Sequence, residues 1–159
     1  MGFNLAILIS GRGSNMLNIV NACNNKTLSS KVKIIISNNK NSCGLIKVQK
    51  KGIKTKIINE NQIEKFEKKL SQILLEERVN LICLAGFMKI LSKEFLCNWE
   101  KKVINIHPSI LPAFRGLNAV KKAIENKVKY TGCTIHYVDK GIDTGEIIDQ
   151  RIVRVSKTD

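Results

Sequence analysis

The sequence predicts an α/β fold: a doubly wound, mainly parallel sheet with helices on both faces. Short apolar stretches recur along the chain, and segments with a helical spacing of apolar residues lie between them. This alternation is typical of βαβ units, because parallel strands need long crossovers that are usually helical. Residues 81–85 are continuously apolar, as expected for a central parallel strand that is buried on both faces.

The first half of the chain is expected to contribute strands at residues 5–9, 32–37, 53–58 and 81–85. A first helix should begin at Ser14 or Asn15, since both residue types cap helices. A second helix is expected over residues 42–51, ended by Gly52. A third helix carries an apolar stripe that predicts core packing, formed by Ile63, Phe66, Leu70, Ile73 and Leu74.

The second half is expected to form strands at residues 103–107, 131–138 and 147–155, with a helix over residues 118–126. Pro108 should end the first of these strands, because proline lacks the backbone N–H that a strand ladder needs. No linker, internal repeat or low-complexity block interrupts the sequence, so residues 1–159 are expected to form a single domain.

The composition indicates a globular protein of the cytoplasm. Hydrophobic residues make up 43% of the chain and charged residues 25%, and no apolar run is long enough to span a bilayer. The five cysteines are scattered without a C-x-x-C pair, so neither disulfides nor a metal site is expected. The formal net charge of +14 would suit nucleic acid, but the lysines are spread along the chain and indicate a solvated surface instead.

A glycine-containing turn, Ser10-Gly11-Arg12-Gly13-Ser14-Asn15, joins the first strand to the first helix. The free N–H groups at a helix N-terminus bind anions, so this turn is a candidate phosphate site. It lacks the G-K-[ST] ending of a Walker loop and the third glycine of the dinucleotide motif. A tight turn that needs glycine only for its backbone angles is an equal alternative.

The stretch from Asn105 to Pro112 is the strongest candidate for a catalytic site. It contains one of the two histidines and both prolines. Side chains two apart on a strand share a face, so the Asn105 amide and the His107 imidazole should lie side by side at a strand end. Ligands of open α/β sheets bind at the carboxyl ends of strands. The alternative is a buried strand end whose polar groups have structural partners.

Two further loops are candidates for ligand binding. Residues 86–91 are unusually apolar for a loop, and they could either line a pocket for a flat aromatic ligand or fold back into the core. Residues 139–145 contain two glycines and two aspartates. The second histidine, His136, lies in an alternating strand pattern and is expected to be a packed strand residue rather than a ligand.

Taken together, these segments resemble the phosphoribosylglycinamide formyltransferases, folate-dependent enzymes of purine biosynthesis. The motif Asn-x-His-Pro-Ser-x-Leu-Pro at residues 105–112, with Asp-x-Gly at 143–145, is specific for the folate formyltransferase superfamily. The turn at residues 10–15 narrows the resemblance to enzymes that act on glycinamide ribonucleotide. Residues 84–91 and 132–138 also match, and the resemblance implies the Rossmann-like fold of that family.

The resemblance also implies roles for individual residues. The catalytic trio would be Asn105, His107 and Asp143. The ribose phosphate of the substrate would bind at Gly13, Ser14 and Asn15. The pterin of the cosubstrate, 10-formyltetrahydrofolate, would bind at Met88, Lys89, Ile90 and Leu91, and at the backbone of Asp139, Lys140, Gly141 and Ile142. No metal is required, and the Leu111–Pro112 peptide bond is expected to be cis.

The chemistry of such an enzyme fits these residue types. The substrate's amine attacks the formyl carbon and forms a tetrahedral intermediate with an oxyanion, to which the Asn105 amide and a protonated His107 can donate. Asp143 would stabilise the imidazolium and position a water that carries the proton from the amine to the leaving nitrogen. Cys133 is not expected to be catalytic.

Two features depart from the family. Lys89 stands where many relatives have arginine, which keeps the charge but not the fork geometry. Relatives usually continue beyond the position of Asp159 with a strand and a helix that help to bind the ribonucleotide, so this chain is expected to lack them.

The alternatives are a sibling enzyme or a different class of protein. Methionyl-tRNA formyltransferase and formyltetrahydrofolate hydrolase share the core chemistry, but each carries an additional domain. A non-catalytic nucleotide-binding α/β module is disfavoured because the trio is intact. The expected partners are glycinamide ribonucleotide and folate, without nucleic acid or membrane, and the protein is expected to be a monomer or a homodimer.

Overall fold

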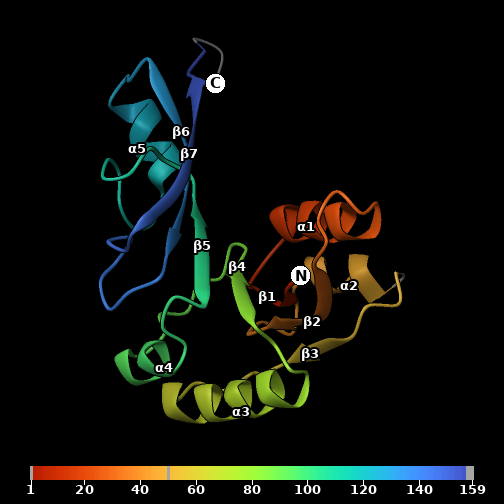
Figure 1. The fold of residues 1–159 in the computed structure, drawn as a ribbon. Helices are drawn as coiled ribbons and strands as arrows, with labels where there is room; N and C mark the ends of the chain where they lie inside the picture. Colours follow the sequence, from red (N-terminus) through yellow and green to blue (C-terminus); the bar gives the residue numbers. More distant parts are fainter. Residues whose placement is uncertain (1, 50, 157–159) are drawn as a thin grey trace. The chain divides into compact units, whose positions relative to one another are not determined.

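The computed structural model describes residues 2–49 and 51–156. The chain divides into two compact units, Met1–Asn98 and Trp99–Asp159, each with its own strands and helices (Figure 1). The expectation of a single domain remains a prediction.

The first unit is a parallel α/β sheet whose strands pair in the order β3-β2-β1-β4. The strands are β1 (Asn4–Ile9), β2 (Lys31–Ser37), β3 (Thr55–Ile57) and β4 (Leu81–Leu84). The helices are α1 (Ser14–Asn24), α2 (Cys43–Gln49), α3 (Ile63–Glu76) and α4 (Lys93–Asn98). In Figure 1, α1 lies above β1, β2 and β3, and α3 lies below them, so helices cover both faces of this sheet.

The core of the first unit follows from its apolar strands. In β1, which lies inside the sheet, residues 5–9 are at most 4% exposed. A strand with neighbours on both sides and helices on both faces has no solvated side, which explains its continuous apolar sequence. β3 is shorter than the predicted strand at residues 53–58, and its Ile57 is 45% exposed, as expected for a strand at the edge of this sheet.

The helices of the first unit match the predicted pattern with small differences. In α3, Phe66, Leu70 and Leu74 are completely buried, which confirms the core-packing stripe. α2 is shorter than the predicted helix at residues 42–51, of which Lys50 lies outside the described residues. The sequence pattern does not predict α4, because its six residues are too few to show a helical period.

The second unit is an antiparallel sheet with a helix beside it. β5 (Val103–His107) pairs with β6 (Tyr130–Tyr137), which pairs with β7 (Ile147–Arg154), and α5 (Ala119–Glu125) precedes β6. β5 has the predicted bounds and ends before Pro108. The loop that joins β6 to β7 is too short for a parallel crossover, which explains why these two strands form an antiparallel hairpin.

The strand register gathers polar side chains on one face of the second unit. His107 pairs with Thr134, which pairs with Gln150, while Asn105 pairs with His136. Directly opposed residues and residues two apart on a strand lie on the same face of a sheet. The pairing of β6 with β7 shifts between Ile135 and His136, and such bulges re-aim side chains next to functional sites.

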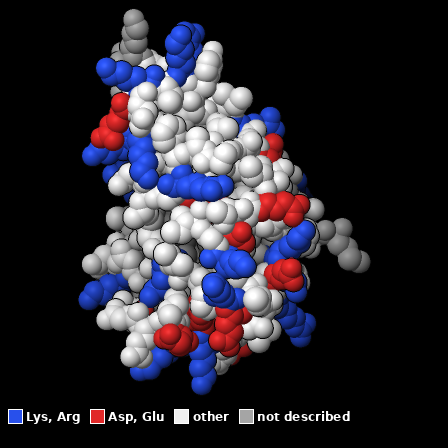
Figure 2. Space-filling view, turned by 90° about the vertical axis from the view of Figure 1, so that its left-hand side faces the viewer, with Lys and Arg blue, Asp and Glu red and all other residues white. Residues whose placement is uncertain are grey.

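The α/β class and the mainly parallel sheet are confirmed by the parallel pairs of β1, β2, β3 and β4, with β6 and β7 as antiparallel additions. On the face that Figure 2 shows, Lys and Arg are interspersed with acidic and uncharged residues. Within residues 2–49 and 51–156, no helix is both long and apolar enough to cross a membrane.

Candidate active site

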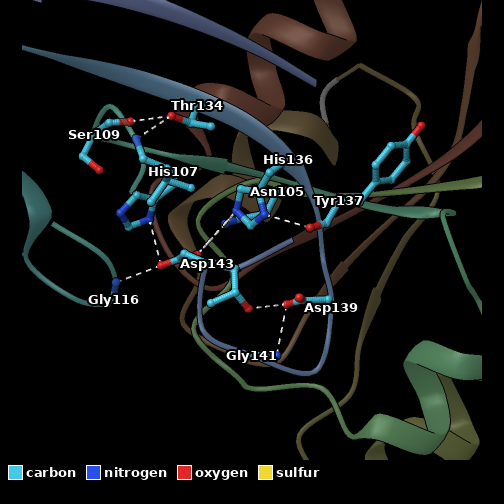
Figure 3. A network of polar contacts seen from close by, with 12 residues as sticks. Asn105, His107, Ser109, Gly116, Thr134, His136, Tyr137, Asp139, Gly141 and Asp143 are labelled. Carbon is cyan, nitrogen blue, oxygen red and sulfur yellow. Dashed lines mark hydrogen bonds and ion pairs between the residues drawn. The ribbon is translucent and has the colours of Figure 1, made fainter. Parts of the chain in front are cut away.

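Asp143 is the centre of a polar network in the second unit, and it contacts both other members of the predicted trio (Figure 3). Its Oδ2 lies 3.2 Å from Nδ1 of His107, and its Oδ1 lies 3.5 Å from Nδ2 of Asn105. The structure therefore brings the Asp143 carboxylate to the Asn105 amide, which is 38 positions away in the sequence, and to the neighbouring His107 imidazole. Their catalytic role remains a prediction.

Local sequence explains how the carboxylate reaches this position. Asp143 has a left-handed backbone with φ of 52°, a region that aspartate tolerates better than most residues. Two residues later, Gly145 passes so close to β6 that a Cβ on it would lie 1.8 Å from the carbonyl oxygen of Tyr137. Glycine is therefore required there, and the close approach turns the loop back over the face that carries His107.

The hydrogen bonds of Asp143 fit an ionised carboxylate. Oδ2 also accepts from the backbone N–H of Gly116 at 2.8 Å, and Oδ1 lies 3.4 Å from Nε2 of His136. An ionised carboxylate only accepts hydrogen bonds, and donor groups face both oxygens here: Gly116 and Nδ1 of His107 at Oδ2, and the Asn105 amide at Oδ1. The side chain is 13% exposed, so these contacts replace most of the water that would otherwise solvate the charge.

His107 lies between two acceptors. Its Nε2 is 2.9 Å from the carbonyl oxygen of Phe114, and its Nδ1 faces Asp143. A carbonyl oxygen can only accept, so Nε2 carries a proton. The 3.2 Å contact of Nδ1 with Oδ2 needs a further proton between these two atoms, and the pair is buried, with His107 only 5% exposed. The ring is thus held in one orientation before any ligand arrives.

The backbone after His107 is anchored by buried hydroxyl groups. Thr134 Oγ1 donates to the carbonyl oxygen of Ser109 at 2.7 Å and accepts from the N–H of Leu111 at 3.0 Å. Ser109 Oγ donates to the carbonyl oxygen of Ala113 at 2.5 Å. The Leu111–Pro112 peptide bond is cis, as the resemblance implies.

The predicted phosphate turn lies in the first unit, at the start of α1. The helix cap is Gly13, with φ of 69°, and not Ser14 or Asn15 as the sequence suggests. A glycine is required there because a Cβ would lie 3.0 Å from the Cα of Gly44. No side chain caps α1, and Ser14 and Asn15 are exposed. The first N–H groups of a helix lack intrahelical partners, so the turn can offer them to an anion.

The loop at residues 86–91 combines the two behaviours that its sequence allows. Met88 is 66% and Ile90 75% exposed, whereas Leu91 is 7% exposed and packs inward. Lys89 donates from Nζ to the carbonyl oxygen of Glu60 at 3.1 Å and lies 5.3 Å from the centroid of the Phe66 ring. A single ammonium suffices for these contacts, so the fork of an arginine is not needed to hold the loop.

Ser10 connects this loop to the phosphate turn. Its Oγ accepts from the N–H of Met88 at 2.8 Å and donates to Oδ1 of Asn38 at 2.7 Å. Its backbone N–H donates to the carbonyl oxygen of Gly86 at 3.1 Å. The segments that follow β1, β2 and β4 are therefore fastened together at the carboxyl end of the parallel sheet, where ligands of such sheets bind.

The remaining predicted contact residues form an exposed loop of the second unit. Asp139, Lys140, Gly141 and Ile142 are all exposed. Oδ1 of Asp139 accepts from the N–H of Gly141 at 3.0 Å and from Oγ1 of Thr144 at 2.7 Å, so the loop has a defined turn. Ile142 offers an apolar surface, since its side chain is 59% exposed.

Comparison with known proteins identifies the family, because residues 3–159 match the family model described as Formyl transferase. The chain belongs to the formyl transferase family. The recognition from the motifs at residues 10–15, 105–112 and 143–145 is thereby confirmed.

Solved structures and curated relatives of this formyl transferase are similar over nearly all of its chain. Phosphoribosylglycinamide formyltransferase from Anaplasma phagocytophilum is 42% identical with a TM-score of 0.91, over 100% of this chain and 76% of that one. Glycinamide ribonucleotide transformylase 1 from Symbiobacterium toebii is 34% identical with a TM-score of 0.95, over 99% and 76%. The Homo sapiens trifunctional purine biosynthetic protein adenosine-3 is 42% identical over 98% of this chain, which spans only 16% of that relative's length.

One residue of this formyl transferase's network is not anticipated by the sequence. His136 is a packed strand residue as expected, at 2% exposed, but its Nε2 lies 3.2 Å from Nδ2 of Asn105 as well as near Asp143. Its Nδ1 is 2.8 Å from the carbonyl oxygen of Tyr137 and so carries a proton, which leaves Nε2 to accept from the amide. Only the antiparallel register, which places His136 opposite Asn105, could have revealed this contact.

The cysteines of this formyl transferase are free thiols outside the polar network. Burial, with a smaller effect of Cys23, raises the pKa of Cys83 to about 12, so that thiol stays protonated and unreactive. In the described part of the chain, no group of three or more His, Cys, Asp or Glu side chains is arranged to hold a metal ion.

Proposed function

We propose that this chain transfers the formyl group of 10-formyltetrahydrofolate to the amine of glycinamide ribonucleotide, as a cytoplasmic step of purine biosynthesis. Support comes from the similar solved structures, which are a glycinamide ribonucleotide transformylase and a phosphoribosylglycinamide formyltransferase. The observation that carries the proposal is the 3.2 Å contact between His107 and Asp143, with the amide of Asn105 beside them. A non-catalytic nucleotide-binding module would have no need of a buried ion pair on one face of its sheet.

In the proposed reaction, the amine nitrogen of the ribonucleotide attacks the formyl carbon of the folate. A new C–N bond forms, and the carbonyl oxygen becomes an oxyanion. The intermediate then collapses: the bond to N10 of the folate breaks, and the proton lost by the amine is delivered to N10. No oxidant, metal or covalent enzyme intermediate is needed, so catalysis rests on hydrogen-bond donors and on the transfer of one proton.

Asn105 and His107 are the proposed donors to the oxyanion. The amide contact of Asn105 with Asp143 is long, at 3.5 Å, and an oxyanion would be a stronger partner for the same N–H group. His107 donates from Nε2 to the carbonyl oxygen of Phe114, which a substrate oxygen would have to replace. Meanwhile Nδ1 stays paired with Asp143, so the ring keeps its charge and its orientation.

Asp143 has the proposed role of holding the charge of His107 and guiding the proton. Because His107, Asn105 and Gly116 already face its oxygens as donors, it can orient an incoming water only by exchanging one of these contacts. The contact with Asn105 is the longest of the three and is released when that amide turns to the oxyanion. Oxyanion binding and proton transfer are coupled in this way.

The substrate contacts in each unit are proposed from their geometry. The uncapped start of α1, with Gly13, Ser14 and Asn15, would hold the ribose phosphate through backbone N–H groups and the helix dipole. In the first unit, the exposed apolar side chains of Met88 and Ile90, with the adjoining Lys89 and Leu91, are the proposed folate contacts. In the second unit, the proposed folate contact is the exposed backbone of residues 139–142.

The experiment that tests the proposal mixes the protein with 10-formyltetrahydrofolate, with and without glycinamide ribonucleotide, and follows the folate absorbance. Turnover that requires the ribonucleotide supports the proposal. Turnover without the ribonucleotide would instead identify a formyltetrahydrofolate hydrolase. Absence of turnover in both samples, with both ligands bound, would identify a binding module, and turnover only with methionyl-tRNA would identify the tRNA enzyme.

A further inference from the structure

A side chain on β7 contacts the backbone that leaves the candidate active site. The segment Ser109–Leu111 follows His107 and Pro108, and the strand ladder does not satisfy its polar groups. Side chains hold both of its ends: Thr134 bonds the carbonyl oxygen of Ser109 and the N–H of Leu111, and Nε2 of Gln150 donates to the carbonyl oxygen of Leu111 at 3.0 Å. Gln150 also donates to Oγ1 of Thr134 at 2.9 Å.

The bonds of Thr134 fix the direction of this network. A threonine hydroxyl has one proton and two acceptor lone pairs. Its proton goes to the carbonyl oxygen of Ser109, and its two lone pairs accept from Leu111 and Gln150. Thr134 is completely buried, so no water can take the place of a missing partner. Every hydrogen-bonding site of the hydroxyl is used, and Gln150 must be a donor.

The orientation of the Gln150 amide follows from the same count. Both of its observed contacts are with oxygen atoms that need a donor, namely Leu111 O and Thr134 Oγ1. A flipped amide would place its carbonyl oxygen against both of them, and the network therefore accepts only one orientation. Gln150, Thr134 and His107 are consecutive cross-strand partners on β7, β6 and β5, so they form one row across the sheet.

From this geometry we propose that Gln150 is a positioning residue, which acts through Thr134 and Leu111 to fix the segment that follows His107. This inference rests on the proposed formyl transfer. The contacts of Asn105, His107 and Asp143 described above do not include Gln150, so its effect on the reaction is indirect. Loss of the Gln150 N–H groups removes the side-chain donor of the Leu111 carbonyl oxygen and leaves one lone pair of Thr134 Oγ1 unused, and the segment then moves to find another partner. The ring of His107 moves with it.

Kinetics of Gln150 variants test this role. Gln150→Leu removes both donors, and Gln150→Glu replaces them with acceptors. We expect kcat to fall roughly 10- to 100-fold in each, because small misplacements of catalytic groups have effects of that size. KM for both substrates should change less than about twofold, because Gln150 does not contact the proposed binding loops. Gln49→Glu, the same chemical change on the exposed side of α2, is the matched control and should have wild-type kinetics.

The imidazole resonances provide a readout that does not depend on turnover. The protein has two histidines, so the ¹⁵N signals of His107 can be assigned by their loss in His107→Ala. Shifted His107 signals in both Gln150 variants, with a retained far-UV circular dichroism spectrum, are expected. If the wild-type protein has no transfer activity, only the proposed function is contradicted. Shifted His107 signals in the Gln150 variants would still support the positioning role.

A milder variant covers the case in which the others do not fold. Gln150→Asn keeps the amide but is one methylene shorter, so it can reach only one of the two oxygens. It should be slower than wild type and faster than Gln150→Leu. Wild-type kcat in Gln150→Asn or Gln150→Leu, or unchanged His107 signals in a folded Gln150→Leu, overturns the inference. A parallel rise of KM for both substrates without a change of kcat also overturns it.

Discussion

The two units of this formyl transferase present their polar groups in opposite ways. In the second unit, the groups around Asp143 already satisfy one another, and His107 is 5% exposed. In the first unit, α1 begins without a side-chain cap and Met88 is 66% exposed. Charges that stabilise a transition state must be oriented beforehand, whereas groups that bind a substrate must stay accessible. Substitutions in the polar network around Asp143 should therefore lower kcat, whereas substitutions in the turn at residues 10–15 and in the loop at residues 86–91 should raise KM.

The largest effect is expected for the ion pair of the second unit. Asp143→Asn keeps the shape of the side chain but removes the charge that holds the His107 imidazolium. We expect kcat to fall roughly a thousandfold, as for the loss of an oriented electrostatic group in other enzymes, with KM nearly unchanged. Asp149→Asn, the same change on exposed β7, is the control. A variant with more than about a tenth of wild-type kcat would remove Asp143 from the mechanism.

The next effect concerns the phosphate turn. Gly13 and Gly52 both have a left-handed backbone, with φ of 69° and 68°, but only at Gly13 would a Cβ contact neighbouring atoms. Alanine should destabilise either position by about 1–2 kcal/mol through backbone strain. Gly13→Ala should also raise KM for glycinamide ribonucleotide about tenfold, because a distorted helix start loses charge-assisted bonds of about 1.5–3 kcal/mol. If Gly52→Ala raises that KM equally, the turn is not the phosphate site.

A smaller effect is expected at Ser10. Ser10→Ala removes the acceptor of the Met88 N–H and so loosens the loop at residues 86–91. One lost hydrogen bond contributes about 1 kcal/mol, so KM for 10-formyltetrahydrofolate should rise roughly fivefold while kcat stays constant. Ser30→Ala removes a comparable acceptor, that of the Phe3 N–H, and should leave both constants unchanged. An effect on kcat rather than KM would contradict the assignment of the loop at residues 86–91 to substrate binding.

The smallest effect is chemical and concerns Cys83. Because burial raises the pKa of this thiol to about 12, the reactive thiolate is scarce at every pH well below that value. Iodoacetamide at pH 7 to 9 should label the exposed Cys43 and Cys97 and spare Cys83. Activity should be retained while only the exposed sites are modified. Peptide mass spectrometry measures the labelling. Early labelling of Cys83 would show that the core of the first unit opens.

The sequence predicts the parallel part of the fold well because local patterns determine it. The apolar stretch at residues 5–9 and the stripe of α3 each follow from a single period, and both are buried as expected. The antiparallel pairing of β5 with β6 is not shown by any local pattern, because a connection that contains a helix, here α5, is also typical of parallel strands. For the same reason the contacts of His136 and Gln150 are visible only once β5, β6 and β7 are aligned.

The motifs predict the trio, but not its electrostatic surroundings. Asn105 and His107 share a strand, and their common face follows from alternation alone. The position of Asp143 next to His107 depends on the turn at Gly145, whose close approach to β6 cannot be predicted from the residue order. Residue type favours Ser14 or Asn15 as the cap of α1, because serine and asparagine are better caps than glycine. The observed cap, Gly13, has no side chain to bond the first N–H groups and leaves them for a ligand.

The central claim is that His107 and Asp143 act as one unit, and a double-mutant cycle tests it most directly. Turnover is measured for His107→Ala, Asp143→Asn and the double variant under the same conditions. If the carboxylate acts through the imidazole, the double variant should be no slower than the slower single variant. Independent contributions would instead multiply, and a double variant slowed by the product of the two single effects would contradict the account.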